Sequence, residues 1–256
     1  MNFGNGYRLK KNNLNRLRPF IIRVNTANSG ISNSDQFQFT GAEGDYSVVA
    51  KQGGLIVSIF PNLSGEQTIT LPSPGIYDLE IKPKLSNGFN RIKFREDLNP
   101  VKVNDIKQWG NTVWSSIENL FLSNNQVIIT ATDAPNLTLV TNMQSSMRGN
   151  SLNPDVSNWD VSNVTNMNFM FLRATSANPD VSNWDVSNVT TMILMFFGSN
   201  LSTQNLTLIY ENWSQLTLQQ NVVFDVGDKK YNTSGQAGRD ILVNTYNWTV
   251  IDGGQI

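Results

Sequence analysis

The amino-acid sequence predicts a mixed, β-rich fold in which a small β-sandwich precedes a short repeat solenoid and a C-terminal α/β cap. The first observation is a repeat: NPDVSNWDVSNVTNMNFMF begins at residue 153, and NPDVSNWDVSNVTTMILMF begins at residue 178. A period near 25 residues predicts stacked units, because one such unit cannot bury its own apolar face. The second observation is a series of short apolar runs separated by turn residues over 19–100. The third is that apolar residues after residue 202 recur at the spacing of a helix.

Two weaker copies precede the near-identical pair. Anchored on Trp114, Val140, Val164 and Val189, the spacings are 26, 24 and 25 residues, so the predicted solenoid spans 101–202 with about four repeats. We expect the recurring apolar residues to point inward and to stack on their counterparts one repeat away. After Val164 their spacing becomes three to four residues, which suits a short helical turn. The inward set of one unit is Trp159, Val161, Val164, Met167, Met170 and Phe171.

The polar residues of each unit predict turns. Asn and Asp side chains form hydrogen bonds to their own backbone, so the Asn-Pro-Asp and Ser-Asn pairs favour turns, and stacked asparagines favour ladders along the array. The alternative is a calcium site built from Asp155, Asp160, Asp180 and Asp185. No loop has the dense alternating acidic spacing that is typical of a calcium-binding turn, so we favour the turn interpretation.

The repeat resembles the BspA-like leucine-rich repeat family, whose units read roughly W-D-V-S-N-V-T-N-M-x-x-M-F. The motif stands here at 159–171 and again at 184–196, and the resemblance covers most of 101–256. Members of this family are typically surface-exposed binding proteins of bacteria, and related arrays occur in proteins of the phages that infect them. The resemblance therefore implies a leucine-rich-repeat solenoid that works in surface attachment.

The segment 19–100 predicts the β-sandwich. The turn at 51–54 joins two of its strands as a hairpin. The stretch PSPGIYDLEI at 72–81 resembles the penultimate strand of PKD-like, immunoglobulin-type domains, but the acidic W-G-D-G signature of such domains is replaced by VVAKQGGL at 48–55. That departure removes any inherited ligand site and leaves the expected role of a spacer and mount. Strands are predicted at 20–24, 36–39, 46–50, 55–60, 68–71, 76–81 and 91–94.

The terminal units of a solenoid need covers for their exposed core. The sandwich is expected to cover one end, and the cap at 203–256 the other. Within the cap we predict helices over 206–213 and 238–246, and strands at 222–224 and 248–251.

Residues 1–18 form a basic arm. They hold five basic residues and no acid, a net charge of +5, whereas residues from 101 onward hold twelve acids and seven bases, a net of −5. One interpretation is a solvated terminus. We favour the other, in which the arm anchors the chain to an assembly partner, which for a phage protein would be other virion proteins. The anchoring candidates are Arg8, Lys10, Lys11, Arg16 and Arg18.

Composition argues against most catalytic designs. The chain has no cysteine and no histidine, which removes disulfides, thiolate zinc sites and every triad with an imidazole base. We therefore expect neither enzymatic activity nor a cofactor. An enzyme acting on surface glycans, with Trp159 and Trp184 stacking on sugars, is a minor alternative, because tryptophans at repeat spacing are more typical of a core. A net charge of −1 does not indicate nucleic-acid binding, and no apolar run has the length for membrane insertion.

Two functions remain. The preferred hypothesis is a structural and receptor-facing component of a bacteriophage virion surface: a capsid fibre, decoration protein or tail-tip protein. The alternative is a bacterial surface adhesin or secreted binding module at the cell surface. The first residues lack the apolar run of a secretory signal, which favours the phage protein.

Positions that differ between the near-identical units are the candidates for an exposed binding surface. They would contact a host-surface protein or glycan, or alternatively pack on the neighbouring repeat or a partner chain. We also expect a homo-oligomer, a dimer or trimer. The candidates are Asn168, Phe169 and Arg173 in one unit and Ile193, Leu194 and Phe197 in the next.

Overall fold

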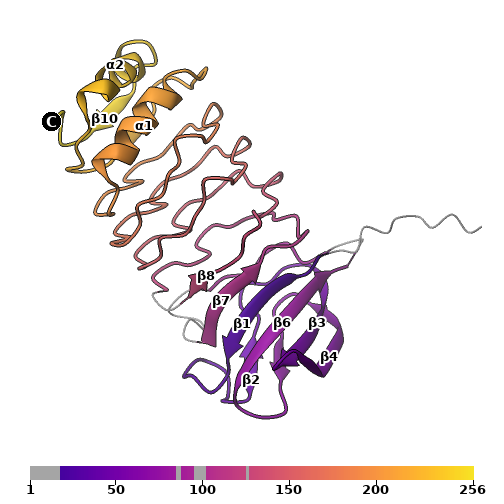
Figure 1. Cartoon of the computed structure of the whole chain (residues 1–256). Coiled ribbons are helices and arrows are strands. Elements are labelled where there is room, and N and C mark those ends of the chain that lie inside the picture. The colour runs from indigo at the N-terminus through magenta and orange to yellow at the C-terminus, as the bar shows by residue number, and fades with distance from the viewer. Residues whose placement is uncertain (1–17, 85–87, 95–101, 125–126) are drawn as a thin grey trace, which may run out of the picture.

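The computed structural model describes residues 18–84, 88–94, 102–124 and 127–256. The molecule is elongated and β-rich, with a sheet at one end, a series of stacked coils in the middle and two helices at the other end (Figure 1). No helix in the described ranges is long and apolar enough to cross a membrane. The strands are β1 (Phe20–Asn25), β2 (Gln36–Gln38), β3 (Asp45–Gln52), β4 (Leu55–Ser64), β5 (Thr68–Thr70), β6 (Ile76–Pro83), β7 (Val103–Gln108), β8 (Ile128–Ile129), β9 (Val223–Asp225) and β10 (Thr249–Ile251), and the helices are α1 (Thr203–Trp213), the 3-10 helix η2 (Thr233–Gly235) and α2 (Gln236–Asn244).

The main sheet is mixed, with six strands in the order β4-β3-β6-β1-β7-β8. Its pairs are antiparallel except β7 with β8, which is parallel. Alternate residues of β1, β3 and β6 are buried, as expected for strands with one face on a core. The small sheet of β2 and β5 supplies Phe37 and Ile69 to that core, and Phe39 packs on Tyr46 of β3 with ring centroids 5.2 Å apart.

The six strands predicted between residues 20 and 81 are confirmed, and so is the hairpin turn between β3 and β4. Gly53 and Gly54 in that turn have φ values of +58° and +86°, which only glycine adopts readily. The strand predicted at 91–94 is wrong. Arg91 forms one isolated bridge with Glu43, and the next residues turn toward the coils, where the N–H of Phe94 donates to the Leu120 carbonyl.

Beyond the sheet the chain forms the coil stack, which we define as residues 109–124 and 127–202. Isolated parallel bridges join successive coils, among them Asn142 with Asn166 and Asn166 with Thr191. The backbone N–H of Phe171 donates to the carbonyl of Met195 on the next coil at 2.8 Å. The side chains predicted to point inward are buried, and Phe171 stacks on Phe196 with an interplanar angle of 3°.

The sheet and the coil stack share one hydrophobic core. Phe20 of β1 packs on Trp109 and Trp114 of the first coil, with ring centroids 5.8 and 5.0 Å apart. Gly110 makes this junction tight, because a Cβ built on it would lie 2.2 Å from the Pro19 carbonyl oxygen. β7, which begins inside the segment predicted as repeats, is itself a strand of the sheet. The sheet is therefore continuous with the first coil, which it covers.

Lys102 ties the start of β7 to the loop between β1 and β2. Its side chain is fully buried, and Nζ donates to the carbonyls of Ser32 (2.9 Å), Asn33 (2.6 Å) and Gln36 (2.9 Å) and to the Ser32 hydroxyl (3.0 Å). Burial lowers the pKa of Lys102, and the charge of Asp35 opposes this. The four oxygens replace the water molecules that the Lys102 ammonium loses on folding.

The cap closes the far end of the stack. Both predicted helices and both predicted strands are confirmed as α1, α2, β9 and β10. The indole N–H of Trp184 donates to the Val156 carbonyl of the preceding coil at 2.9 Å, and that of Trp213 in α1 donates to the Val181 carbonyl at 3.1 Å. Helix α1 therefore docks through the same kind of bond that Trp184 makes with the coil before it.

Candidate binding surface on the coil stack

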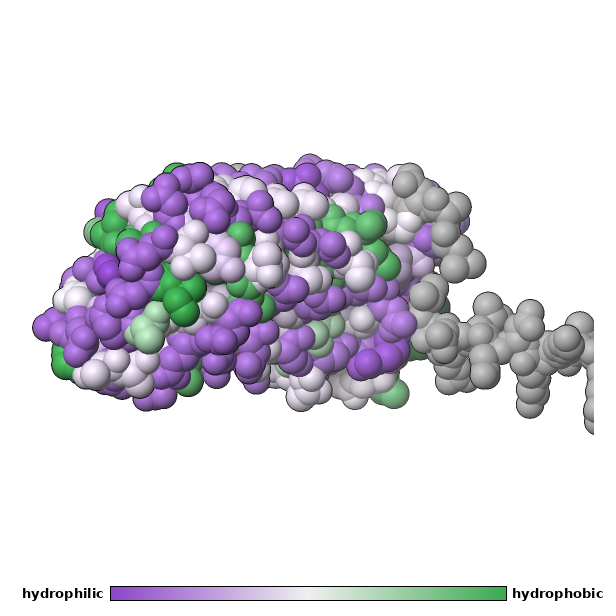
Figure 2. Space-filling model, turned by 90° about the horizontal axis from the view of Figure 1, so that it is seen from above, coloured by the Kyte–Doolittle hydropathy of each residue, from purple (hydrophilic) through white to green (hydrophobic). Residues whose placement is uncertain are grey.

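The structure brings the six predicted surface residues together on two adjacent coils. The backbone N–H of Phe169 donates to the Ile193 carbonyl at 2.9 Å, and that of Arg173 donates to the Phe197 carbonyl at 2.8 Å. Ile193 and Phe197 are 40% and 43% exposed, and Arg173 is also exposed. On the face shown in Figure 2, hydrophobic side chains form small separate groups among hydrophilic ones.

The predicted residues differ in what they do. The Oδ1 of Asn168 accepts hydrogen bonds from the Thr191 hydroxyl at 2.6 Å and from the Ile193 N–H at 2.7 Å, so this side chain joins two coils. The Arg148 guanidinium lies 5.9 Å from the ring centroid of half-buried Phe169. Packing between repeats thus explains Asn168, whereas Arg173, Ile193 and Phe197 stay available to a partner.

Two positions in each coil have left-handed backbone, which replaces the helical turn predicted after Val164. Phe169 and Leu194 have φ values of +59° and +52°, and Arg173 has +55°. A left-handed residue interrupts a right-handed helical turn, so the prediction of a helical turn is wrong. The first position is held by Asn119, Ser145, Phe169 and Leu194, and the second by Ser123, Gly149, Arg173 and Gly198.

Substitutions at Arg173 test this geometry. We expect Arg173→Gly to be more stable than Arg173→Ala by about 0.5–1 kcal/mol. Alanine keeps the strain of the left-handed backbone, which glycine avoids. The greater conformational entropy of glycine in the unfolded chain offsets part of this advantage. Urea unfolding of the two variants measures the difference. At exposed Thr175, whose φ is not positive, alanine should be the more stable replacement; the same order at both sites would contradict the account.

The aspartates of the repeats form turns, as predicted. The Oδ1 atoms of Asp155, Asp160, Asp180 and Asp185 each accept the N–H of the serine two residues later, at 3.0–3.1 Å. Hydrogen bonds from the serine hydroxyls lower the pKa of Asp155 and Asp160. Within the described ranges, no group of three or more His, Cys, Asp or Glu side chains is placed to hold a metal ion.

Asparagine side chains also join successive coils, although Asn163 and Asn188 bond to backbone carbonyls and not to one another. Asn163 Nδ2 donates to the Thr138 carbonyl at 3.2 Å, and Asn188 Nδ2 donates to the Ser162 carbonyl at 2.7 Å, each one coil back. Trp159 and Trp184 are 5% and 2% exposed, so they are core residues and not platforms for sugar stacking.

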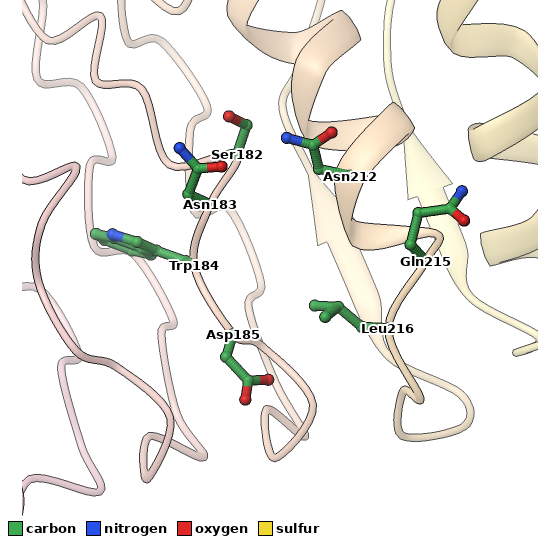
Figure 3. A pocket seen from close by; sticks show the side chains of 7 residues that line it. All are labelled: Ser182, Asn183, Trp184, Asp185, Asn212, Gln215 and Leu216. Atoms are coloured by element: carbon green, nitrogen blue, oxygen red, sulfur yellow. The ribbon is translucent and has the colours of Figure 1, made fainter.

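A groove between the last coil and α1 has no signal in the sequence. The groove has a volume of about 430 Å³, and in Figure 3 the Asn212 side chain extends from α1 toward Ser182 and Asn183. Trp184 points the other way, into the stack. The exposed lining offers amides and one carboxylate and contains no lysine or arginine, so it disfavours an anionic ligand. The lining residues are Ser182, Asn183, Trp184, Asp185, Asn212, Gln215 and Leu216.

Of the predicted arm, only Arg18 falls within the described residues; Arg8, Lys10, Lys11 and Arg16 lie outside them. The Arg18 guanidinium is 3.3 Å from Asp133 Oδ2 and donates to Gln108 Oε1 at 3.3 Å. Its carbonyl accepts the Asn111 N–H at 2.9 Å. Arg18 is therefore held on the folded body beside the first coil.

Comparison with known proteins gives one family. The family model described as "Mycoplasma protein of unknown function, DUF285" matches residues 115–234, which include most of the coil stack and the first part of the cap. A search of curated proteins and a search of solved structures found no match.

Proposed function

We propose that the chain is a non-enzymatic structural and binding component of a bacteriophage virion surface, such as a capsid fibre, decoration protein or tail-tip protein. In this proposal the sheet region is an immunoglobulin-like β-sandwich mount, and the coil stack is a BspA-like leucine-rich-repeat solenoid presented for attachment. The observation that carries the proposal is the placement of sequence differences. Ile193, Phe197 and Arg173 differ between near-identical units and lie together, exposed, on adjacent coils.

The chemistry of this surface supports recognition of a host-surface protein or glycan. Arg173 supplies a guanidinium, and Ile193 and Phe197 supply apolar contact beside it. The groove next to α1 adds the amides of Asn183 and Asn212. Both ends of the stack are covered, one by the sheet and one by α1, so the lateral faces are where a partner would bind.

A bacterial surface adhesin or secreted binding module is the second candidate. The match over residues 115–234 to a family described by its occurrence in Mycoplasma favours it, because that description refers to cellular organisms and not to phages. The two candidates share the binding surface and differ in whether the chain is carried on a particle.

Removing residues 1–17 distinguishes the two candidates. The cut leaves the contacts of Arg18 with Asp133 and Asn111 in place, so the folded part should keep its melting temperature. We expect the full chain to co-sediment with virus particles and the shortened chain to lose this association while still binding host cells. Equal behaviour of both chains, with direct binding to bacterial cells, would replace the virion proposal with the adhesin.

Substitutions on the coil stack test the attachment surface itself. We expect the triple variant Arg173→Gln, Ile193→Ser, Phe197→Ser to bind host cells about tenfold more weakly or worse, because each position removes partner contact without opening the core. Leu139→Ser is the control, since Leu139 is 63% exposed on an earlier coil. Flow cytometry of labelled protein gives the measurement. Equal loss in the control, or none in the triple variant, would contradict this assignment.

A further inference from the structure

Strand β4 is the open edge of the main sheet. It pairs with β3 on one side and has no neighbour on the other among the residues that the structure describes. The opposite edge, β8, leads into the coil stack, so the two edges differ in kind (Figure 1). Open edges are places where another chain can associate, and proteins usually protect them with charged side chains.

β4 lacks that protection over its first half. Leu55, Ile56, Val57 and Ile59 are 74%, 58%, 37% and 60% exposed, and no residue of β4 is charged. Side chains exposed to this degree present on the order of 400 Å² of apolar surface, spread over the free edge and both faces of the strand, compared with roughly 300–600 Å² for the largest patch on a typical monomer. A patch of this size marks an interaction surface.

The pairing of β4 indicates how a partner would use it. The register with β3 shifts between Ala50 and Lys51, next to Val57, and Pro61 has no N–H to donate. Both features bend the strand and interrupt a regular backbone ladder. Contact through side chains is therefore favoured over extension of the sheet by a further strand.

We propose that β4 packs against β4 of a second copy of this chain about a twofold axis. In such a contact the same patch lies on both sides, so any charge would face its own like charge. β4 carries none, and nearby Lys51 is already paired with Glu80. A standard interface buries roughly 800 Å² per partner, so the apolar patch supplies about half and the rest comes from polar parts of the β3–β4 hairpin.

The contact leaves the coil stacks free. β4 lies at the end of the molecule away from α1 and α2 (Figure 1), so a dimer joined there carries two separate stacks. Two linked binding surfaces would raise the avidity for a surface with many copies of the receptor. The dimer proposal rests on β4 and the β3–β4 hairpin, and it does not depend on what the coil stack binds.

Sedimentation velocity of the full chain over the micromolar range tests the proposal. We expect the mass to rise from 28.6 kDa toward twice that value with concentration. Ile59→Lys and Ile59→Glu should each weaken association about tenfold or more, and an equal mixture of the two should restore it, because opposite charges then face each other across the axis. Ile59 is exposed, so unchanged melting temperatures of both variants would verify folding.

Ile31→Lys is the matched control, since Ile31 is 55% exposed in the loop between β1 and β2. It should associate as the unaltered chain does. A chain that stays monomeric throughout, an Ile59→Lys variant that associates normally, or equal weakening by Ile31→Lys would each overturn the proposal.

Discussion

Lys102→Met is expected to lower the free energy of unfolding by about 1.5–3 kcal/mol, the net contribution of hydrogen bonds to a charged group. Methionine fits the channel of the lysine stem but donates no hydrogen bond. The carbonyls of Ser32, Asn33 and Gln36 would lose the ammonium that they share. Ser32 and Gln36 are half-buried and Asn33 is exposed, so water can replace part of the lost donor, and the effect comes from the loop as much as from the lysine.

Urea unfolding followed by tryptophan fluorescence measures this loss. Lys107→Met is the control, because Lys107 has a side chain 31% exposed and lies 3.4 Å from Asp78 in a surface ion pair. Such pairs contribute about 0–1 kcal/mol, so the control should stay near the unaltered chain. A loss below about 1 kcal/mol for Lys102→Met would show that the four contacts do not stabilise the fold.

Gly110→Ala is expected to lower the free energy of unfolding by about 2–5 kcal/mol, from two causes that add. Gly110 has a φ of +67°, which costs an L residue about 1–2 kcal/mol. A Cβ at this position would also lie 2.2 Å from the Pro19 oxygen and 2.4 Å from the Arg18 oxygen, and both belong to backbone. Overpacking of this kind costs about 1–3 kcal/mol more.

Gly53→Ala separates the two causes. Gly53 has a φ of +58°, but a Cβ built there meets nothing within 4 Å. The control therefore pays only for backbone strain, about 1–2 kcal/mol. Equal losses at Gly110 and Gly53 in urea unfolding would mean that the backbone at 18–19 moves aside, and that the junction of sheet and first coil is looser than its contacts indicate.

Much of the fold could be predicted from the sequence because local pattern and tertiary packing agree. Alternation in 20–24 and 76–81 survives as β1 and β6, and the apolar residues that recur every 25 positions are the core of the coils. The helical turn after Val164 failed for a specific reason. Spacing of three to four residues is shared by a helix and by a left-handed turn, and the sign of φ at Phe169 is not visible in the sequence.

The candidate surface was only partly predictable. Differences between near-identical units located exposed Ile193 and Phe197 correctly, but they could not separate Arg173, which is exposed, from Asn168, which bonds to the next coil. The groove was missed because its walls come from different elements. Asn183 belongs to the last coil and Asn212 to α1, and only the docking of α1 brings them together.

Trp184 and Trp213 make the same kind of indole-to-carbonyl bond, and this allows the length of the molecule to change by whole repeat units. Helix α1 bonds to the last coil as Trp184 bonds to the coil before it. A further unit inserted between 177 and 178 would therefore find the same kind of bonding partner in the coil before it and in the coil after it. Each added unit would carry the cap roughly 4.8 Å farther from the sheet, the spacing of hydrogen-bonded strands. Duplication of a single repeat would thus lengthen the molecule without changing the contacts of the sheet with the first coil or of α1 with the last coil.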